Sequence, residues 1–151
     1  MDFTSEQHKN YMRLAIKESA KSDDPHTKVG CVIVNSSGKV ISTGYNHFLN
    51  KAKKGAFPTG RDYNDKSEWL NTKYPYIVHA EASAIIQAKK DLSGCTLYVT
   101  LGSCYNCAKL IADSGISHVY YIDDKYKDDP EFKASTKIFK SCHVSNTKIK
   151  L

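Results

Sequence analysis

The chain has 151 residues, of which 40% are hydrophobic and 25% are charged, so we expect a single globular domain over residues 1–151. It has no apolar run long enough to cross a membrane and no signal-peptide pattern at its start, which predicts a protein of the cytoplasm, or of the host cytoplasm if the source is viral. The net charge is +6, yet only Arg13 and Arg61 are arginines, the side chain that most often reads base edges. We therefore expect neither a nucleic-acid nor a membrane partner.

The N-terminal part of the sequence predicts a helix followed by a β-hairpin. Thr4–Gln7 has the pattern of a capping box, and apolar residues follow it at helical spacing. Asp23–Pro25 ends this helix because the residue before a proline leaves the helical region. Two β-branched runs, 29–34 and 40–45, flank an Asn-Ser-Ser-Gly turn and together indicate a hairpin over residues 29–45.

Residues 46–75 show no sustained helix or strand pattern. A connection of that length within a compact domain is usually functional or disordered. Aromatic side chains are interleaved with cations here, an arrangement that suits a nucleotide site and equally suits a solvated insertion packed by its own aromatic rings. The residues concerned are Phe48, Phe57, Tyr63 and Trp69 among Lys51, Lys53, Lys54 and Arg61.

The C-terminal half predicts helices and strands in alternation. The order α-β-β-α-β-α-β-α, with the later strands separated by helices, predicts a mixed sheet that is covered on both faces. The expected fold class is therefore α/β, as a three-layer α/β/α sandwich with a mixed central sheet of about five strands. We expect helices over 81–90, 104–114 and about 130–140, and strands over 96–100, 118–122 and 144–149, the last a weak edge strand.

Two short motifs contain the residues of a metal site. His79 begins the triplet His79-Ala80-Glu81, and Cys104 and Cys107 are the ends of a Cys-Tyr-Asn-Cys segment. Each motif stands at a predicted helix start, where the partial positive charge favours thiolates, and cysteines three residues apart lie on one face of a first helical turn. One histidine and two cysteines predict one zinc ion per chain with its fourth position open, which is the catalytic rather than the structural arrangement.

Glu81 gives this predicted zinc site a specific chemistry. Water in the open position has its pKa lowered to roughly 7. Glu81 is placed to take a proton from that water and to deliver it to a ring nitrogen of the substrate, then to a departing amine. An H-x-E motif followed by C-x-x-C is the signature of zinc-dependent nucleobase deaminases, in which hydroxide attacks C4 of cytosine and ammonia leaves.

Each half of this pattern alone has a simpler explanation. An H-x-E triplet often occurs by chance, and a C-x-x-C pair also occurs in redox sites and in halves of structural zinc sites. If another histidine bound the zinc ion as a fourth protein ligand, it would close the site. Both halves in this order, each at a helix start, favour the catalytic site. The histidines that could close the site are His26, His47, His118 and His143.

From about Tyr11 to Ile122 the sequence resembles the deoxycytidylate (dCMP) deaminase family, within the cytidine-deaminase-like superfamily. The H-A-E and C-x-x-C motifs are common to the superfamily, whereas Gly44-Tyr45-Asn46 and Lys73-Tyr74-Pro75-Tyr76 are similar to dCMP deaminases in particular. The resemblance also rests on Asp24-Pro25, Thr27-Lys28-Val29-Gly30, Leu97-Tyr98-Val99-Thr100 and Ala108-Lys109.

The resemblance implies a zinc-dependent hydrolytic deamination of dCMP to dUMP, which supplies the precursor of dTTP. It assigns the zinc ligands to His79, Cys104 and Cys107 and the proton transfer to Glu81. Substrate contacts are implied at Asn46 for the sugar or pyrimidine, at Thr27 and Lys28 for the phosphate, and at Ala80, Ser103 and Tyr105.

Members of that family are typically homohexamers, activated by dCTP and inhibited by dTTP with Mg²⁺, so the resemblance implies the same assembly and regulation. The implied effector site involves Tyr45, Asn46 and Phe48. The family's glycine-proline pattern after the Gly-Tyr-Asn triplet is replaced here by His-Phe-Leu, a departure that bears on the effector site and not on the zinc site. Ser103 stands where proline is usual, and Ser83 stands where asparagine is usual.

Two other functions fit the same residues. The first is deamination of another cytosine species, either dCTP or a base within nucleic acid. The second is a zinc-stabilised nucleotide-binding module without catalysis. A polynucleotide editor should have a basic channel that contains arginine, which this sequence does not clearly show. A module without chemistry has no need of a proton carrier at Glu81, so this residue separates an enzyme from such a module.

Overall fold

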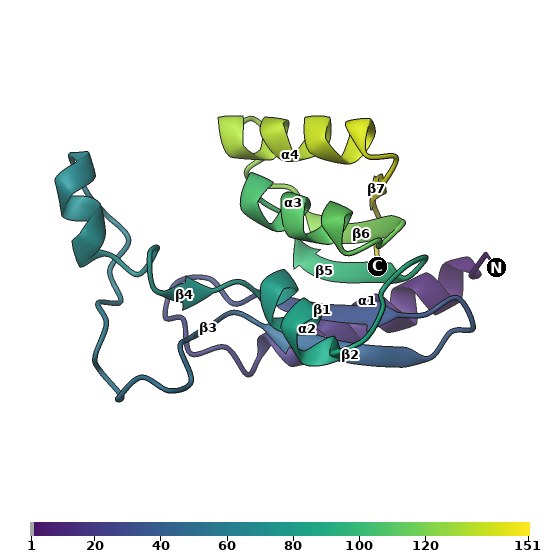
Figure 1. Cartoon of the computed structure of the whole chain (residues 1–151), viewed down its shortest axis with the longest axis horizontal. Coiled ribbons are helices and arrows are strands. Elements are labelled where there is room, and N and C mark those ends of the chain that lie inside the picture. The colour runs from purple at the N-terminus through teal and green to yellow at the C-terminus, as the bar shows by residue number, and fades with distance from the viewer. Residues whose placement is uncertain (1) are drawn as a thin grey trace.

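The structure, a computed structural model, describes residues 2–151 and has a five-stranded central sheet with the strand order β2-β1-β5-β6-β7 (Figure 1). β1 (Gly30–Val34) runs antiparallel to both β2 (Val40–Tyr45) and β5 (Thr96–Leu101). β6 (His118–Asp123) is parallel to β5 and to the edge strand β7 (Ser145–Lys148). The mixed sheet of five strands that the sequence predicts is confirmed.

Helices cover both faces of this sheet. α1 (Ser5–Ser19) packs on one face, and α2 (Ala80–Ala88), α3 (Tyr105–Asp113) and α4 (Pro130–Ser141) lie on the other (Figure 1). These layers form the predicted α/β/α sandwich. Among the helices of residues 2–151, none has the length and apolar character needed to cross a bilayer.

The alternation of side chains along the central strands divides the core into two parts. In β1, Cys31 and Ile33 pack in the cluster beneath α2 and α3, whereas Val32 and Val34 pack in the cluster beneath α1. Every residue of β1 is buried. A strand buried on both faces reads as a continuous apolar run, which is why this segment shows no polar alternation in the sequence. The sheet is therefore a buried central layer against which α2 and α3 pack.

The helices begin where the sequence predicts. α1 begins with the predicted capping box, in which the Gln7 amide donates to Thr4 Oγ1 over 3.1 Å and the Thr4 amide donates to Gln7 Oε1 over 2.8 Å. It ends at Ser19, before the expected stop, and the amides of residues 20–22 then bond to carbonyl oxygens three rather than four positions back. His79 and Cys104 occupy the N-cap positions of α2 and α3, so both metal motifs stand at helix starts as predicted.

The long segment between β2 and α2 leaves the sheet as an arm, defined here as residues 49–76, which projects away from the sandwich (Figure 1). The neck of the arm is a two-stranded ladder of β3 (His47–Phe48) and β4 (Ile77–Val78). The arm itself contains the short 3-10 helix η1 (Lys66–Asn71). The sequence predicts none of these elements, because strands of two residues and one short 3-10 helix show no measurable periodicity.

Gly44 allows α2 to lie directly against the sheet. A Cβ atom at this position of β2 would lie 2.5 Å from the Ala80 carbonyl oxygen and 2.5 Å from the Ala84 amide nitrogen. Both of those atoms belong to the backbone of α2, so neither is the end of a flexible side chain that could move aside. The absence of a side chain at Gly44 therefore sets the position of the first turn of α2, which contains Glu81.

We expect Gly44→Ala to force α2 away from β2 and to lower the free energy of unfolding by about 2 kcal/mol, the usual cost of overpacking. For a chain of this size that corresponds to a Tm roughly 4–8 °C lower, measurable by thermal denaturation. Gly60→Ala is the matched control, because a Cβ at Gly60 has no heavy atom within 4 Å. Equal melting temperatures for the two variants would contradict this account of the α2 contact.

Candidate metal centre and active site

The starts of α2 and α3 bring three metal-binding side chains together. His79 follows β4 directly, and Cys104 follows β5 after a short loop, so the two helices begin at the same end of the sheet. His79 Nδ1 lies 3.3 Å from Cys107 Sγ and 3.6 Å from Cys104 Sγ. All three ligand atoms lie within 4.8 Å of one another. The sequence prediction that these residues converge is therefore confirmed.

These separations fit a tetrahedral zinc ion. With Zn–S bonds of about 2.3 Å and Zn–N bonds of about 2.0–2.1 Å, a nitrogen and a sulfur ligand of one ion lie about 3.5 Å apart. One nitrogen and two sulfur donors leave a fourth position open. Within residues 2–151, no other group of three His, Cys, Asp or Glu side chains converges in this way, and no fourth ligand joins this one. The geometry suits one open zinc site.

The three ligands share protons in the absence of metal, and contact with Cys104 together with burial raises the pKa of Cys107 well above its usual value. Contact with Cys107 and with His79 lowers the pKa of Cys104 to about 4, although burial acts in the opposite direction. The contact with Cys104 raises the pKa of His79 to about 9. The thiolate of Cys104 is the form that binds a metal ion. A zinc ion bound here would take the place of the proton on His79, so metal binding and proton release are coupled.

Glu81 lies in the first turn of α2, two residues after His79, and only 4% of it is exposed. Burial raises the pKa of its carboxyl group, and the charge of His79 opposes that rise. A carboxyl group with a raised pKa holds a proton more readily near neutral pH, as a group that moves protons requires.

Ser103 is a second buried polar group beside Glu81. Its side chain is 2% exposed, and within residues 2–151 its hydroxyl has no hydrogen-bond partner. Although it forms no hydrogen bond of normal geometry, this hydroxyl lies close enough to Glu81 to lower the pKa of that carboxyl group, against the larger effect of burial. The serine that replaces the expected proline therefore puts an additional donor beside the carboxylate.

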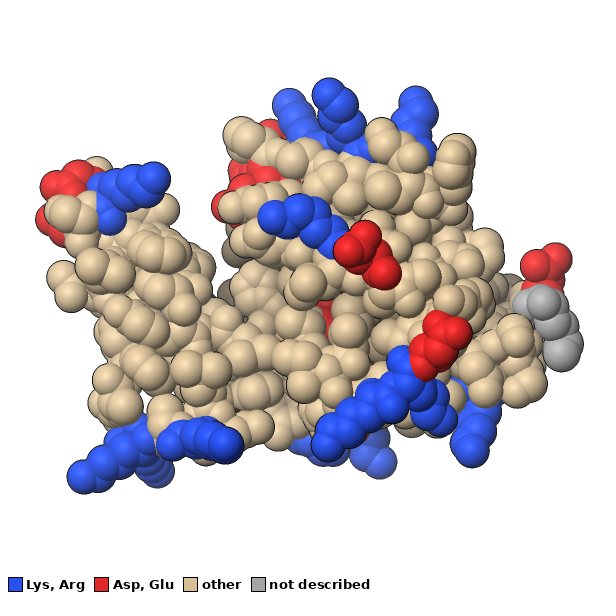
Figure 2. Space-filling view, in the orientation of Figure 1, with Lys and Arg blue, Asp and Glu red and all other residues tan. Residues whose placement is uncertain are grey.

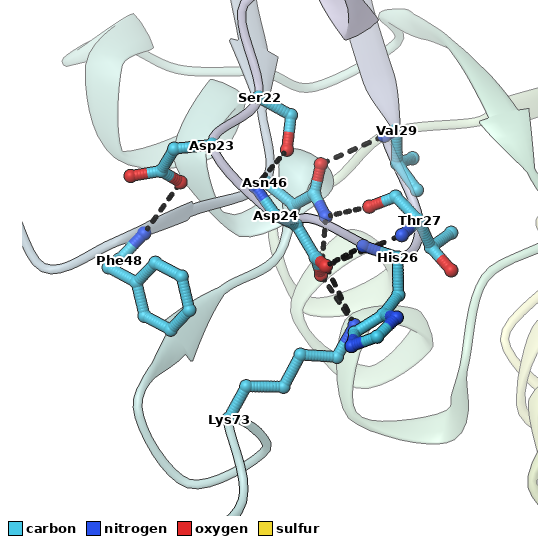
Figure 3. Close-up of polar contacts among 9 residues, drawn as sticks. All are labelled: Ser22, Asp23, Asp24, His26, Thr27, Val29, Asn46, Phe48 and Lys73. Carbon is cyan, nitrogen blue, oxygen red and sulfur yellow. Dashed lines mark hydrogen bonds and ion pairs between the residues drawn. The ribbon is translucent and has the colours of Figure 1, made fainter. Parts of the chain in front are cut away.

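Asn46 is buried at the end of β2, and its amide group is used within the protein (Figure 3). Its Oδ1 accepts from the Val29 amide over 2.8 Å, and its Nδ2 donates to the Thr27 carbonyl oxygen over 2.7 Å and to Asp24 Oδ2 over 3.4 Å. Asn46 thus fixes the turn that precedes β1. Its contact with a sugar or pyrimidine stays a prediction.

Sequence reasoning missed a buried ion pair between Asp24 and Lys73 (Figure 3). The Lys73 ammonium lies 2.6 Å from Asp24 Oδ2 and 2.9 Å from Asp24 Oδ1, and the two side chains are 6% and 2% exposed. Burial acts to raise the pKa of Asp24, but hydrogen bonds from Lys73 and from the His26 and Thr27 amides bring it below its usual value. Both residues belong to segments that carried the family resemblance, and that was the one signal available.

The remaining predicted site residues lie around this end of the sheet. Lys28 is exposed and its ammonium donates to the Ser22 carbonyl oxygen over 2.9 Å. Tyr105 is partly exposed, with the Lys109 ammonium 5.4 Å from its ring centroid. Ala80 is buried, whereas Thr27, Tyr45 and Phe48 are half-buried.

Comparison with known proteins agrees with this geometry. Residues 5–123 match the family described as the cytidine and deoxycytidylate deaminase zinc-binding region. The chain belongs to this family. It is a zinc-dependent deaminase, and therefore a hydrolase.

The deaminase has relatives in animals and viruses. It is 39% identical to human deoxycytidylate deaminase over 136 residues, which cover 89% of this chain and 75% of the human protein. It is 36% identical to the deoxycytidylate deaminase of Mycobacterium phage D29 over 121 residues, which cover 74% of this chain and 90% of the phage protein. These relatives confirm the resemblance to the deoxycytidylate deaminase family.

Solved structures share the fold. The dCMP deaminase of cyanophage S-TIM5, in complex with dCMP and dUMP, superposes with a TM-score of 0.72 at 23% identity and covers 98% of this chain and 100% of its own. A bifunctional deaminase and reductase from Thermotoga maritima superposes with a TM-score of 0.65 at 24% identity, and the match covers 95% of this chain and 36% of that protein. The predicted cytidine-deaminase-like architecture is confirmed.

Proposed function

We propose that this deaminase converts dCMP to dUMP and ammonia by hydrolysis. The observation that carries the proposal is the convergence of His79, Cys104 and Cys107 beside the buried carboxyl group of Glu81. The substrate is supported by the curated relatives, several of which are named deoxycytidylate deaminase, and by the cyanophage protein, whose structure contains dCMP and dUMP.

His79 Nδ1 and the two cysteine sulfurs would hold the zinc ion. When bound there, zinc supplies the Lewis acidity that makes a water molecule nucleophilic near neutral pH. Glu81 accepts a proton from the attacking water and delivers it to N3 of the cytosine ring. It then takes the remaining proton from the hydroxyl now bound to C4 and delivers it to the amine, so that the C4–N bond breaks, ammonia leaves and C4 keeps the oxygen as the carbonyl of uracil. Burial of Glu81 keeps bulk water from competing for those protons.

The nucleotide is proposed to bind across the turn before β1 and the starts of α2 and α3. The exposed cation of Lys28 suits the phosphate, and the exposed ring of Tyr105 offers a flat apolar surface for the nucleoside. The proposed contacts are Thr27, Lys28, Asn46, Ala80, Ser103 and Tyr105.

Substrate choice is tested by incubating the zinc-loaded protein with dCMP, dCTP, deoxycytidine and single-stranded DNA, and measuring the ammonia released. We expect release from dCMP and little from the others. Glu81→Gln is the matched control, because it keeps the size and burial of the side chain but cannot carry a proton. We expect it to lower kcat for dCMP by at least about a hundredfold while its zinc content stays that of the wild type.

The outcomes separate the alternatives. Turnover of dCTP or DNA with dCMP untouched would contradict the proposed substrate. No turnover by the wild-type protein, together with tight nucleotide binding, would instead indicate the module without catalysis. Undiminished activity in Glu81→Gln would refute the role of this carboxylate.

We also propose that the chain forms a homohexamer, activated by dCTP and inhibited by dTTP with Mg²⁺, and that the segment 46–75 takes part in this control. Effector contacts are proposed at Tyr45, which ends β2, at Asn46, and at Phe48 in the neck of the arm. Assembly is supported by exposed apolar side chains on the α2 and α3 layer, with Ile86 66% exposed and Leu110 48% exposed. Figure 2 shows that most Lys and Arg side chains on this face lie toward its rims.

We expect dCMP kinetics to be sigmoidal without effector, hyperbolic with dCTP, and inhibited by dTTP. Sedimentation of the same samples should give a hexamer, because cooperative kinetics require linked sites. Phe48→Ala should weaken both effector responses and leave the kcat reached at saturating dCMP close to that of the wild type. Hyperbolic kinetics that ignore both triphosphates would contradict the proposed regulation.

A further inference from the structure

The turn at residues 26–29 is held in place by side chains from elsewhere in the chain. The Asp24 carboxylate accepts from the His26 amide over 2.8 Å and from the Thr27 amide over 3.3 Å. Asn46 binds the other side of the turn, at the Thr27 carbonyl oxygen and the Val29 amide (Figure 3). Because this turn precedes β1 and is not part of a helix or a strand, its shape depends on Asp24 and Asn46.

Lys73 allows the Asp24 carboxylate to stay charged while it is buried beneath the turn's amides. A carboxylate that is 2% exposed is stable only with a partner, because burying an unpaired charge is costly. Lys73 is the cation that binds both of its oxygens. It belongs to the last part of the arm, where its own amide donates to the Gly60 carbonyl oxygen over 2.8 Å. The shape of the turn therefore depends on a side chain 49 positions away.

Both ends of the arm are attached to the same dipeptide. At the near end, the Phe48 amide donates to Asp23 Oδ1 over 3.3 Å. At the far end, Lys73 binds Asp24. Asp23 and Asp24 lie just before the turn in the sequence, so the arm and the turn share one anchor.

We propose that Lys73 and Asp24 are positioning residues for the nucleotide, which hold the turn 26–29, and with it Thr27 and Lys28, at a fixed place relative to the metal centre. The inference rests on the proposed function, in which this turn contacts dCMP. The pair is nearly neutral as a unit and is buried, so it does not attract the phosphate itself. Its contribution is geometric, and it should affect the KM for dCMP more than kcat.

The test compares Lys73→Met with the wild type in three measurements, namely dCMP kinetics, zinc content and hydrogen exchange of the turn amides. Lys73→Met keeps the length of the side chain and removes its charge. We expect the KM for dCMP to rise about tenfold, with kcat and zinc content unchanged within about twofold. The amides of His26 and Thr27 should exchange at least about tenfold faster, because the carboxylate that accepts from them has lost its cation.

Phe139→Leu is the control for lowered stability. Phe139 is buried in α4, which packs against α3 and the edge strand β7, whereas the turn leads into β1, three strands away in the sheet. This variant should therefore lower Tm without changing KM or the exchange of the turn. If Lys73→Met does not fold, the double variant Asp24→Asn/Lys73→Met removes the uncompensated charge and is expected to show the same rise in KM.

A folded Lys73→Met variant with a lowered Tm, but with wild-type KM and wild-type exchange at residues 26–29, would overturn the proposal. The ion pair would then contribute to stability alone. The exchange measurement needs no substrate. Failure of the wild-type protein to deaminate dCMP would therefore contradict the proposed function separately, while fast exchange in the variant would still support the coupling of Lys73 to the turn.

Discussion

The close contact of α2 with β2 is the constraint on which the rest of the site depends. Gly44 lets the backbone of α2 rest on the sheet, and this places His79 and Glu81 at the end of the sheet where β5 leads into α3. Because both helices begin there, the positive ends of two helix dipoles meet at one point. A cluster of thiolates is most easily held at such a point, so the backbone geometry prepares the site for zinc.

The structure contains two buried carboxylates, Asp24 and Glu81, whose surroundings shift their pKa values in opposite directions. Asp24 is paired with Lys73 and with backbone amides, which lower its pKa and keep it charged. Glu81 takes part in no ion pair among residues 2–151, and burial raises its pKa. A carboxylate that stays charged serves as a fixed anchor, whereas one whose proton is easily exchanged serves as a carrier. The difference in environment, rather than in chemistry, suits Asp24 to a structural role and Glu81 to the proposed transfer of protons.

Local sequence signals predicted much of this site. The capping box at Thr4, the buried strand at 30–34 and the two metal motifs at helix starts were all visible because each depends on residues within a few positions of one another. The pairing of Lys73 with Asp24 was not predictable in this way, since two residues 49 positions apart meet only through the path of the arm.

The role of Asn46 shows a second limit of the sequence. Its side chain was expected to face a substrate, and the structure shows that its hydrogen-bonding groups are engaged with the turn before β1. The sequence identified an important amide but not the partners that bind it. Those partners are backbone groups, and backbone groups have no signature in a sequence.

The central claim is that His79, Cys104 and Cys107 hold one zinc ion with its fourth position open to solvent or substrate. X-ray absorption at the zinc edge, combined with metal analysis of the purified protein, tests it most directly. The account predicts one zinc per chain with two sulfur ligands at about 2.3 Å and two nitrogen or oxygen ligands at about 2.0–2.1 Å, one of which is exchangeable. A shell closed by four protein ligands, or a shell unchanged in Cys104→Ser, would contradict it.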